Sequence, residues 1–270
     1  MTRVVVAAIV MMAGACGRLR FDPLGDARST GDVPGTQGDA VAGCATTPGL
    51  VAYWPLDDGA GTVAHDISPN AQDGDVVGGA TWVAGRIGGA LQFDGVTGAI
   101  DLRTTSAFGF GGGTGSFTLA YWVNATSLTN RADIRTFELA HCTGVAYIVG
   151  FVGGLGDAGF SGYDATNHYA TTRSQQGILQ VGTWVHVAHV LDRTNATGQT
   201  YIDGVASGAP GDLTPWVDTI DCSTTELTAS LGGWGTFYYE GALDDVRVYS
   251  RALTATEVAD LAARTTTGCP

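Results

Sequence analysis

The sequence predicts an all-β domain rich in turns, with one short helix near the C-terminus. Glycine supplies 41 of the 270 residues, and only 14% of the residues are charged, compared with about 25% in an average soluble protein. Helical bundles favour Ala, Glu and Lys over Gly and Asp, whereas this chain has no Lys and only four Glu. Hydrophobic residues make up 44% of the chain, a content that argues against disorder.

The net charge of -13 excludes one class of function. All 13 basic residues are Arg and are scattered along the chain, against 26 acidic residues. Nucleic-acid binding requires a clustered basic surface, so we expect no nucleic-acid partner. An acidic balance of this size is ordinary for a soluble exported domain, and we expect a monomer.

Residues 1–15 have the pattern of a secretory signal peptide. A positive start at Arg3 precedes an apolar run from Val4 to Ala13, which is shorter than the roughly 20 residues that span a bilayer. Small residues then lead into Cys16, and this junction resembles a bacterial lipobox with Ala13 in place of the usual Leu. The resemblance implies cleavage before Cys16, lipidation of that cysteine and, because Gly17 follows, transfer to the outer membrane or cell surface. An ordinary signal peptide with an incidental cysteine is the alternative.

Residues 16–43 are predicted to be the lipidated cysteine and a flexible tether. The segment has no apolar periodicity and is dense in Gly, Asp and Pro, a composition that disfavours a packed core. The folded domain is therefore predicted to span residues 44–270.

Short apolar segments separated by Gly and Asp predict the strands of this domain. Several of them alternate with a period of two, as half-buried antiparallel strands do. Asp203-Gly204 is a turn dipeptide typical of a tight hairpin. Many short strands with frequent turns favour a sandwich or a barrel. The clearest strand segments are residues 50–56, 90–93, 117–123, 184–191 and 245–249.

One helix is predicted over residues 255–263. Thr254 and Glu257 have the spacing of a capping box, in which each side chain bonds to the other residue's backbone amide. Val258 and Leu261 then fall on one face, which we expect to pack on the sheets.

The remaining four cysteines predict two disulfides. An even number in an exported protein favours disulfide bonds, and their spacing matches no zinc motif. Three pairings are possible. We favour Cys44–Cys269, because this pair brackets the folded region and domain termini often lie close together, and therefore Cys142–Cys222.

Several segments in order resemble the laminin-G-like, concanavalin A-like domains of bacterial surface proteins. The resemblance covers about residues 47–264 and implies a jelly-roll sandwich of two antiparallel sheets that binds rather than catalyses. The segments that carry it are GLVAYWPLD from Gly49, HDISPN from His65, GALQFDG from Gly89, SFTLAYWV from Ser116, GTWVHVA from Gly182, YIDG from Tyr201 and GALDDVRVYSRAL from Gly241.

The resemblance also implies a structural calcium ion. Calcium prefers carboxylate and carbonyl oxygens, and laminarinase-type relatives hold it with the Asp two positions before such a Val-Arg-Val-Tyr stretch, which is Asp244 here. Asp66, with carbonyl groups around Asn70 and Gly74, is expected to complete the site. The alternative is that Asp66 holds a turn and Asp244 makes a buried hydrogen bond.

The sequence shows no catalytic constellation. Retaining glycosidases need two carboxylates about 5 Å apart, and the resembling enzymes carry Glu-x-Asp-x-x-Glu on one strand, which is absent here. No Gly-x-Ser-x-Gly motif occurs either. His186 lies in a segment that matches a core strand of the family, so we expect a structural role for it. We therefore expect no enzyme.

The aromatic residues outside the family motifs are the candidates for ligand binding. Sugars stack on exposed aromatic rings beside Asp and Asn, and the candidate contacts are Tyr163, Asp164, Trp216 and Trp234. Half-buried strand aromatics are the alternative. Trp54, Trp122 and Trp184 match core positions and are expected to be buried. The sequence thus favours a lipid-anchored glycan-binding module; a protein-adhesion or scaffold domain is the alternative, and a glycoside hydrolase is the third.

Overall fold

The computed structural model describes residues 44, 47–104, 115–128, 134–141, 147–164, 166–216, 227–232 and 238–269. All of them belong to the second of the chain's two compact units, Gly38–Pro270. The predicted signal peptide and the whole of the predicted tether, with Cys16, lie outside the described residues. In the part of the chain that the structure describes, no helix is long and apolar enough to cross a membrane.

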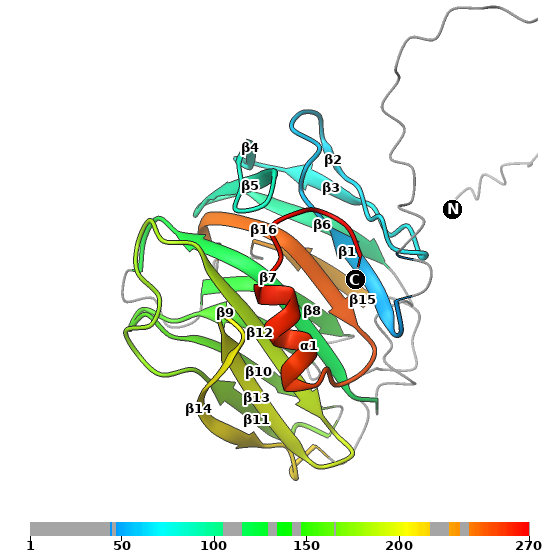
Figure 1. The fold of residues 1–270 in the computed structure, drawn as a ribbon, viewed down its shortest axis with the longest axis vertical. Helices are drawn as coiled ribbons and strands as arrows, with labels where there is room; N and C mark the ends of the chain where they lie inside the picture. The colour runs from blue at the N-terminus through cyan, green and yellow to red at the C-terminus, as the bar shows by residue number, and fades with distance from the viewer. Residues whose placement is uncertain are drawn as a thin grey trace, which may run out of the picture. The chain divides into compact units, whose positions relative to one another are not determined.

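Two antiparallel sheets form the domain, as predicted (Figure 1). Sheet A contains β1 (Leu50–Trp54), β4 (Thr81–Ala84), β5 (Gly89–Asp94), β7 (Phe117–Ala125), β12 (Val185–Asp192), β13 (Thr197–Ile202), β14 (Val205–Asp212) and β16 (Glu240–Tyr249). Its strand order is β14-β13-β12-β7-β16-β5-β4, with β1 paired to β16. Each strand segment expected from the sequence is found here.

Sheet B forms the second layer. It contains β2 (Val63–Ala64), β3 (Gly74–Val77), β6 (Ala99–Thr104), β8 (Ile134–His141), β9 (Tyr147–Val152), β10 (Ala158–Tyr163), β11 (Tyr169–Arg173) and β15 (Leu227–Leu231). The order is β11-β10-β9-β8-β15-β6-β3-β2. Consecutive strands either pair directly or lie in opposite sheets, and the central strands β16 and β15 pair with strands far away in the sequence.

The main core lies between the two sheets. On β7, Phe117, Leu119, Tyr121 and Val123 alternate into this core, as the period of a strand requires. Phe160 on β10 meets Phe117 with ring centroids 5.4 Å apart, which joins the two layers.

Glycine closes one edge of the sandwich. A Cβ atom on Gly208 of β14 would lie 2.0 Å from the carbonyl oxygen of Arg173 on β11, and one on Gly211 would lie 2.3 Å from that of Thr171. Because no side chain fits there, glycine lets the edges of the two sheets approach each other.

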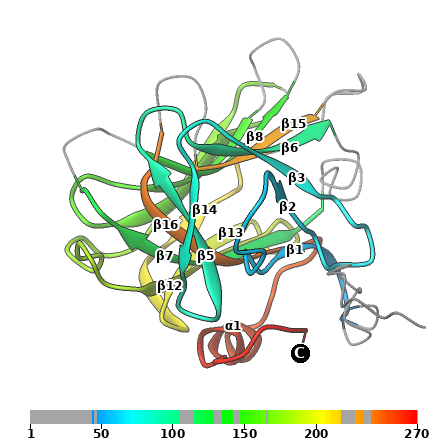
Figure 2. The ribbon, with the colours of Figure 1, turned by 90° about the horizontal axis from the view of Figure 1, so that it is seen from above.

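A short helix, α1 (Ala255–Ala262), covers part of the outer face of sheet A (Figure 2). The predicted capping box between Thr254 and Glu257 is present, and Val258 and Leu261 are buried. They pack in a second apolar cluster with residues of β1, β7, β12 and β16. The prediction of this helix is confirmed.

A disulfide joins Cys44 to Cys269 across 225 positions of sequence. The first predicted pairing is therefore confirmed. Cys142 and Cys222 lie outside the described residues, so their pairing stays a prediction.

A buried ion pair ties β16 to β1 and to the C-terminal segment. Arg247, which is 1% exposed, donates to Asp245 at 3.0 and 3.1 Å and to the carbonyl of Gly268 at 2.9 Å. Its guanidinium carbon lies 3.9 Å from the ring centre of Tyr53, whose hydroxyl donates to Asp245. A β-bulge between Asp244 and Arg247, with Asp245 at φ 52°, makes this arrangement possible because it re-aims the side chain. Asp244 and Asp245 are consequently both buried.

His189 is a fully buried core residue. Its ring lies within hydrogen-bond distance of the hydroxyls of Tyr121 and Thr200, 3.2 Å in each case. Burial lowers the pKa of His189 from 6.5 to about 3, because the charged ring loses its hydration. The neutral ring satisfies both hydroxyl contacts.

We expect acid to destabilise the domain through His189. The unfolded chain takes up a proton below pH 6.5 and the folded chain does so only near pH 3, so stability falls as the pH falls through this range. Urea unfolding at pH 7 and pH 4 should show that wild type loses about 3 kcal/mol more than His189→Gln, which cannot be protonated. An equal loss in the two proteins would contradict this assignment.

Candidate functional site

The outer face of sheet B carries two facing tyrosines. Phe160 points into the core, so Tyr163, three positions along β10, points away from it. Tyr163 pairs in register with Tyr169 of β11 on one side and with Tyr147 of β9 on the other. The rings of Tyr163 and Tyr169 lie 5.0 Å apart at 50°, and Tyr169 is 44% exposed. Among the residues whose burial the structure describes, Tyr169 is the one aromatic in the set of exposed large hydrophobic side chains.

Small residues and one ion pair continue this face. Gly159 and Ser161 precede Tyr163 on β10, and their positions face outward on the same side of the sheet as Tyr163. At the far end of β11, Arg173 donates to Asp157 at 3.0 Å, with the Arg side chain 45% exposed and the Asp side chain 4% exposed. The surface therefore combines two rings, a floor of small residues and a hydrogen-bonding cation.

Asp164 holds the turn between β10 and β11, which corrects the expectation that it contacts a ligand. Its side chain is 0% exposed. It accepts hydrogen bonds from the backbone amides of Thr166 and His168 at 3.0 and 2.8 Å and from the Thr166 hydroxyl at 2.9 Å. Such Asx bonding is the usual role of Asp in a turn, and here it fixes the separation of the two tyrosines.

The expectation that Trp216 contacts a ligand also disagrees with the structure. It is 5% exposed and packs edge-on against Phe160 at 6.3 Å, so no ring face is available to a sugar. Trp234 lies outside the described residues. Trp54 and Trp122 are buried as expected, whereas Trp184 is half-buried.

The structure adds a carboxylate pair that sequence reasoning missed. Asp75 of β3 and Asp101 of β6 are direct partners across the sheet. Both alternate with core residues, Val76 and Ile100, so both lie on the outer face of sheet B. No local signal joins these residues, which are far apart in the sequence, and only the register of the sheet brings them together.

The two aspartates predicted to bind calcium lie in separate hydrogen-bond networks. Asp66 accepts hydrogen bonds from the amides of Tyr53, Ser68 and Gln72, each at 2.8 Å. Asn70 donates to the carbonyl of Val51 at 2.6 Å, and a Cβ on Gly74 would meet Ile100 at 2.3 Å. The described residues contain no cluster of three or more metal-binding side chains. Asp66 therefore holds its own loop.

Asp244 differs from Asp66. One carboxylate oxygen accepts the amides of Arg86 and Ile87 at 2.7 and 2.8 Å, while Oδ1 is buried without a partner. Burial is the main cause that raises the pKa of Asp244, to about 7, and the Asp245 carboxylate raises it further. A buried carboxylate oxygen without a donor is costly, so this atom fits a cation. Calcium binding stays a prediction.

His186 lies on the outer face of sheet A in contact with Trp122, at 5.4 Å between ring centres. It is 2% exposed, and burial lowers its pKa to about 4. A neutral buried ring agrees with the expected structural role. His65 is a half-exposed loop residue within 2.5 Å of Asp58.

With the geometry established, comparison with known proteins gives the family. Residues 93–259 match the family model of the concanavalin A-like lectin/glucanases superfamily, laminin G type. The chain belongs to this superfamily. No curated protein matches it. The resemblance expected from the sequence and the jelly-roll architecture are both confirmed.

Solved structures agree at the level of the fold. The chain is similar to domain 4 of AbnA, an extracellular GH43 arabinanase of Geobacillus stearothermophilus in complex with arabinotriose, with TM-score 0.60 and 23% identity over 79% of this chain and 98% of that one. It is also similar to the binding domain of Paraclostridial Mosquitocidal Protein 1, with TM-score 0.60 and 16% identity over 79% and 52%. A sialidase of Trypanosoma rangeli gives TM-score 0.51 and 18% identity over 79% and 32%. Identities this low support the jelly roll and leave the ligand open.

Proposed function

We propose that this laminin-G-like domain is a non-catalytic glycan-binding module displayed at the cell surface. The exposed Tyr163–Tyr169 pair on the outer face of sheet B is the observation that carries the proposal. Aromatic rings bind the apolar C–H face of a sugar, and neighbouring polar groups bind its hydroxyls. Arg173, whose side chain is 45% exposed, supplies such a group on the same sheet face. The Asp75–Asp101 pair supplies others four strands further along the sheet.

The comparisons support this choice of ligand class. A domain bound to arabinotriose and a toxin binding domain have the same fold. Arabino-oligosaccharides are therefore reasonable first probes, and a broad glycan panel is needed because fold does not determine ligand.

Binding is preferred to catalysis on this surface. Retaining glycosidases need one carboxyl group that stays protonated and one nucleophile, both facing the bond to be cleaved. Asp75 and Asp101 are partly exposed on the open face of a sheet, where water screens their charges. We infer that they act as hydrogen-bond acceptors for hydroxyls.

We expect Tyr169→Ala to weaken glycan binding at least about tenfold, because it removes the exposed ring of the pair. A glycan array followed by calorimetry on the best ligand measures this effect. Tyr201→Ala, on β13 of sheet A, is the control and should keep the affinity. Release of reducing ends from the bound glycan is assayed in parallel and should be zero.

Two results would contradict the proposal. If no glycan binds but cross-linking on cells recovers a specific protein, the domain is an adhesion or scaffold module. If glycan is cleaved and Asp75→Asn or Asp101→Asn stops the cleavage, it is a glycoside hydrolase.

We also propose that Asp244 binds a structural calcium ion. A hard cation would supply the partner that Oδ1 lacks. The Asp244 carboxylate lies against Gly85, and the Asp57 carboxylate lies against Gly88 in the same turn. The ion would join the end of β16 to the turn between β4 and β5.

We expect calcium in excess of EDTA to raise the melting temperature by several degrees, as a ligand at 100 times its Kd stabilises by about 2.7 kcal/mol. Asp244→Asn should abolish the shift. Asp66→Asn is the matched control: it should lower stability through its lost charge and still respond to calcium. An unchanged melting temperature in wild type would exclude the ion.

Lipid anchoring through Cys16 is the remaining part of the proposal. Two or more acyl chains on one cysteine give stable membrane attachment, where a single chain is marginal. In cells fed a labelled fatty acid, wild type should carry label and fractionate with membranes, whereas Cys16→Ser should lose the label. If neither protein carries label and both are released from the membrane fraction equally, the segment is an ordinary signal peptide.

A further inference from the structure

The register of sheet B places one residue from each of seven neighbouring strands in a single row. Positions that pair directly in antiparallel strands lie on the same face of a sheet, and the position of Ser161 faces outward with that of Tyr163. The row therefore crosses the outer face of sheet B from strand to strand. From β11 to β3 it consists of Thr171, Ser161, Val149, Glu138, Ser230, Asp101 and Asp75.

The tyrosine pair flanks one end of this row. Tyr163 and Tyr169 lie two positions away from Ser161 and Thr171 along β10 and β11, and Arg173 lies two positions away from Thr171 on the other side. Ser161 is nearly buried, and the Thr171 hydroxyl donates to a backbone carbonyl of β10 at 2.9 Å. A ligand that packs on the two rings can therefore extend along the row without meeting a bulky side chain at these two positions.

The carboxylate pair forms the other end of the row. Asp75 and Asp101 pair directly, and both side chains are partly exposed. Like charges directly opposite each other destabilise a sheet, and groups that donate hydrogen bonds to both carboxylates offset this effect. Sugar hydroxyls are such donors, whereas an acidic sugar would bring a third negative charge. This end of the row therefore favours an uncharged sugar.

The two ends of the row are too far apart for a short sugar to touch both. Neighbouring strands lie about 4.8 Å apart, and four spacings separate β10, which carries Tyr163, from β6, which carries Asp101. The distance across the sheet is therefore roughly 19 Å. One residue of an extended glycan chain advances about as far as one strand spacing, so a chain needs about five residues to reach both ends. A trisaccharide reaches only one of them.

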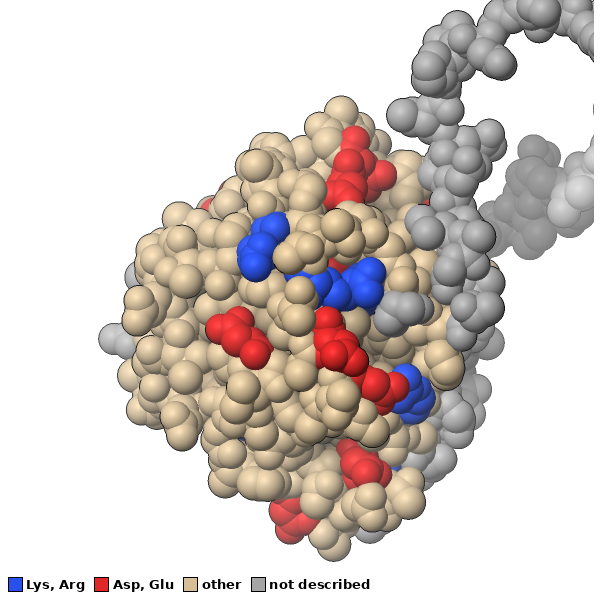
Figure 3. Space-filling model, in the orientation of Figure 1, with Lys and Arg blue, Asp and Glu red and all other residues tan. Residues whose placement is uncertain are grey.

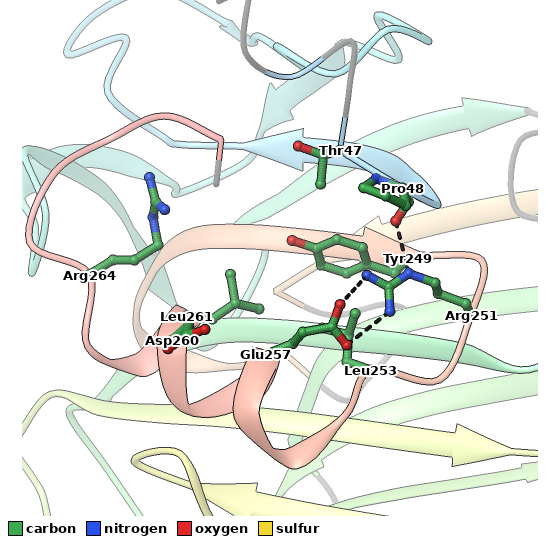
Figure 4. Close-up of a pocket in the computed structure, with 9 residues that line it drawn as sticks. All are labelled: Thr47, Pro48, Tyr249, Arg251, Leu253, Glu257, Asp260, Leu261 and Arg264. Carbon is green, nitrogen blue, oxygen red and sulfur yellow. Dashed lines mark hydrogen bonds and ion pairs between the residues drawn. The ribbon is translucent and has the colours of Figure 1, made fainter.

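The outer face of sheet A is built differently. Basic and acidic side chains are interspersed over this face, where α1 lies (Figure 3). A pocket of about 280 Å³ lies between α1, the end of β16 and the chain entering β1 (Figure 4). At its rim, Arg251 donates to both carboxylate oxygens of Glu257, at 3.0 and 2.6 Å. A pocket of this size holds a small group rather than an extended chain, so the row on sheet B is the better surface for a glycan.

We propose that sheet B binds a linear, uncharged glycan chain of about five residues or more, which lies across the strands along this row. Sugar rings at one end of the bound stretch pack on Tyr163 and Tyr169, and hydroxyls at the other end donate to Asp101 and Asp75. The inference rests on the proposed glycan-binding function and adds the length, direction and charge of the ligand.

Binding of linear oligosaccharides of two to eight residues to the full chain tests the proposal. An array of arabinan, xylan, mannan and cellulose oligosaccharides selects the series that binds best, and calorimetry then measures each length. The affinity should rise at least about tenfold between three and six residues and then level off, because only the longer chain reaches both ends of the row. Galacturonan oligosaccharides of the same length, which are anionic, should bind at least about tenfold more weakly at low salt.

Variants then assign the two ends of the row. Asp101→Ala and Asp75→Ala should each weaken the hexasaccharide at least about tenfold and leave the affinity for the trisaccharide unchanged, since the shorter chain does not reach them. Tyr169→Ala should weaken both lengths. Asp260→Ala, which removes an exposed carboxylate of α1, is the matched control and should bind both lengths as wild type does. Melting temperatures without ligand show that each variant is folded.

Several outcomes would overturn this inference and leave glycan binding intact: an affinity that levels off at two or three residues, wild-type affinity for the hexasaccharide in both aspartate variants, a preference for galacturonan, or binding only of glycans outside the linear series. If no glycan binds at all, the proposed function itself fails. If one aspartate variant does not fold, the other variant and the length series still decide the result.

Discussion

The buried Arg247–Asp245 pair is the constraint on which the rest of sheet A depends. Two charges in the interior are tolerated only when each is neutralised and hydrogen-bonded, and removal of one partner leaves the other uncompensated at a cost of about 3–5 kcal/mol. Here the compensation comes from Tyr53 on β1 and Gly268 near the C-terminus. The edge of the sheet, its central strand and the end of the chain must therefore assemble together.

The outer faces of the two sheets differ in what covers them. Sheet A has its outer face occupied by α1, by the C-terminal segment and by the Trp122–His186 contact. Sheet B has no helix over its outer face in the described part of the chain, and there the tyrosine pair and the carboxylate pair lie. Residues on the outer face of sheet B can accordingly vary without disturbing the buried charges that hold sheet A.

Sequence reasoning predicted the elements and the family well, because strands, caps and hairpin turns are local patterns. The capping box at Thr254 and the Asp203-Gly204 turn are examples. It failed where partners are distant: Asp75 and Asp101 face each other only through sheet register. It also failed where burial decides a role. Trp216 and Asp164 have sugar-binding chemistry, yet one fills the core and the other bonds its own turn.

The disulfide between Cys44 and Cys269 sets how the domain responds to mechanical load. A pull on the chain ahead of Cys44 meets a covalent bond before it meets the hydrogen bonds of β1. The tension passes to the C-terminal segment, which is held to Arg247, Tyr53 and Arg264 through Gly268. The disulfide therefore prevents β1 from detaching from β16 before the rest of the domain unfolds. The domain therefore resists shear as one body when it is pulled from the N-terminal side.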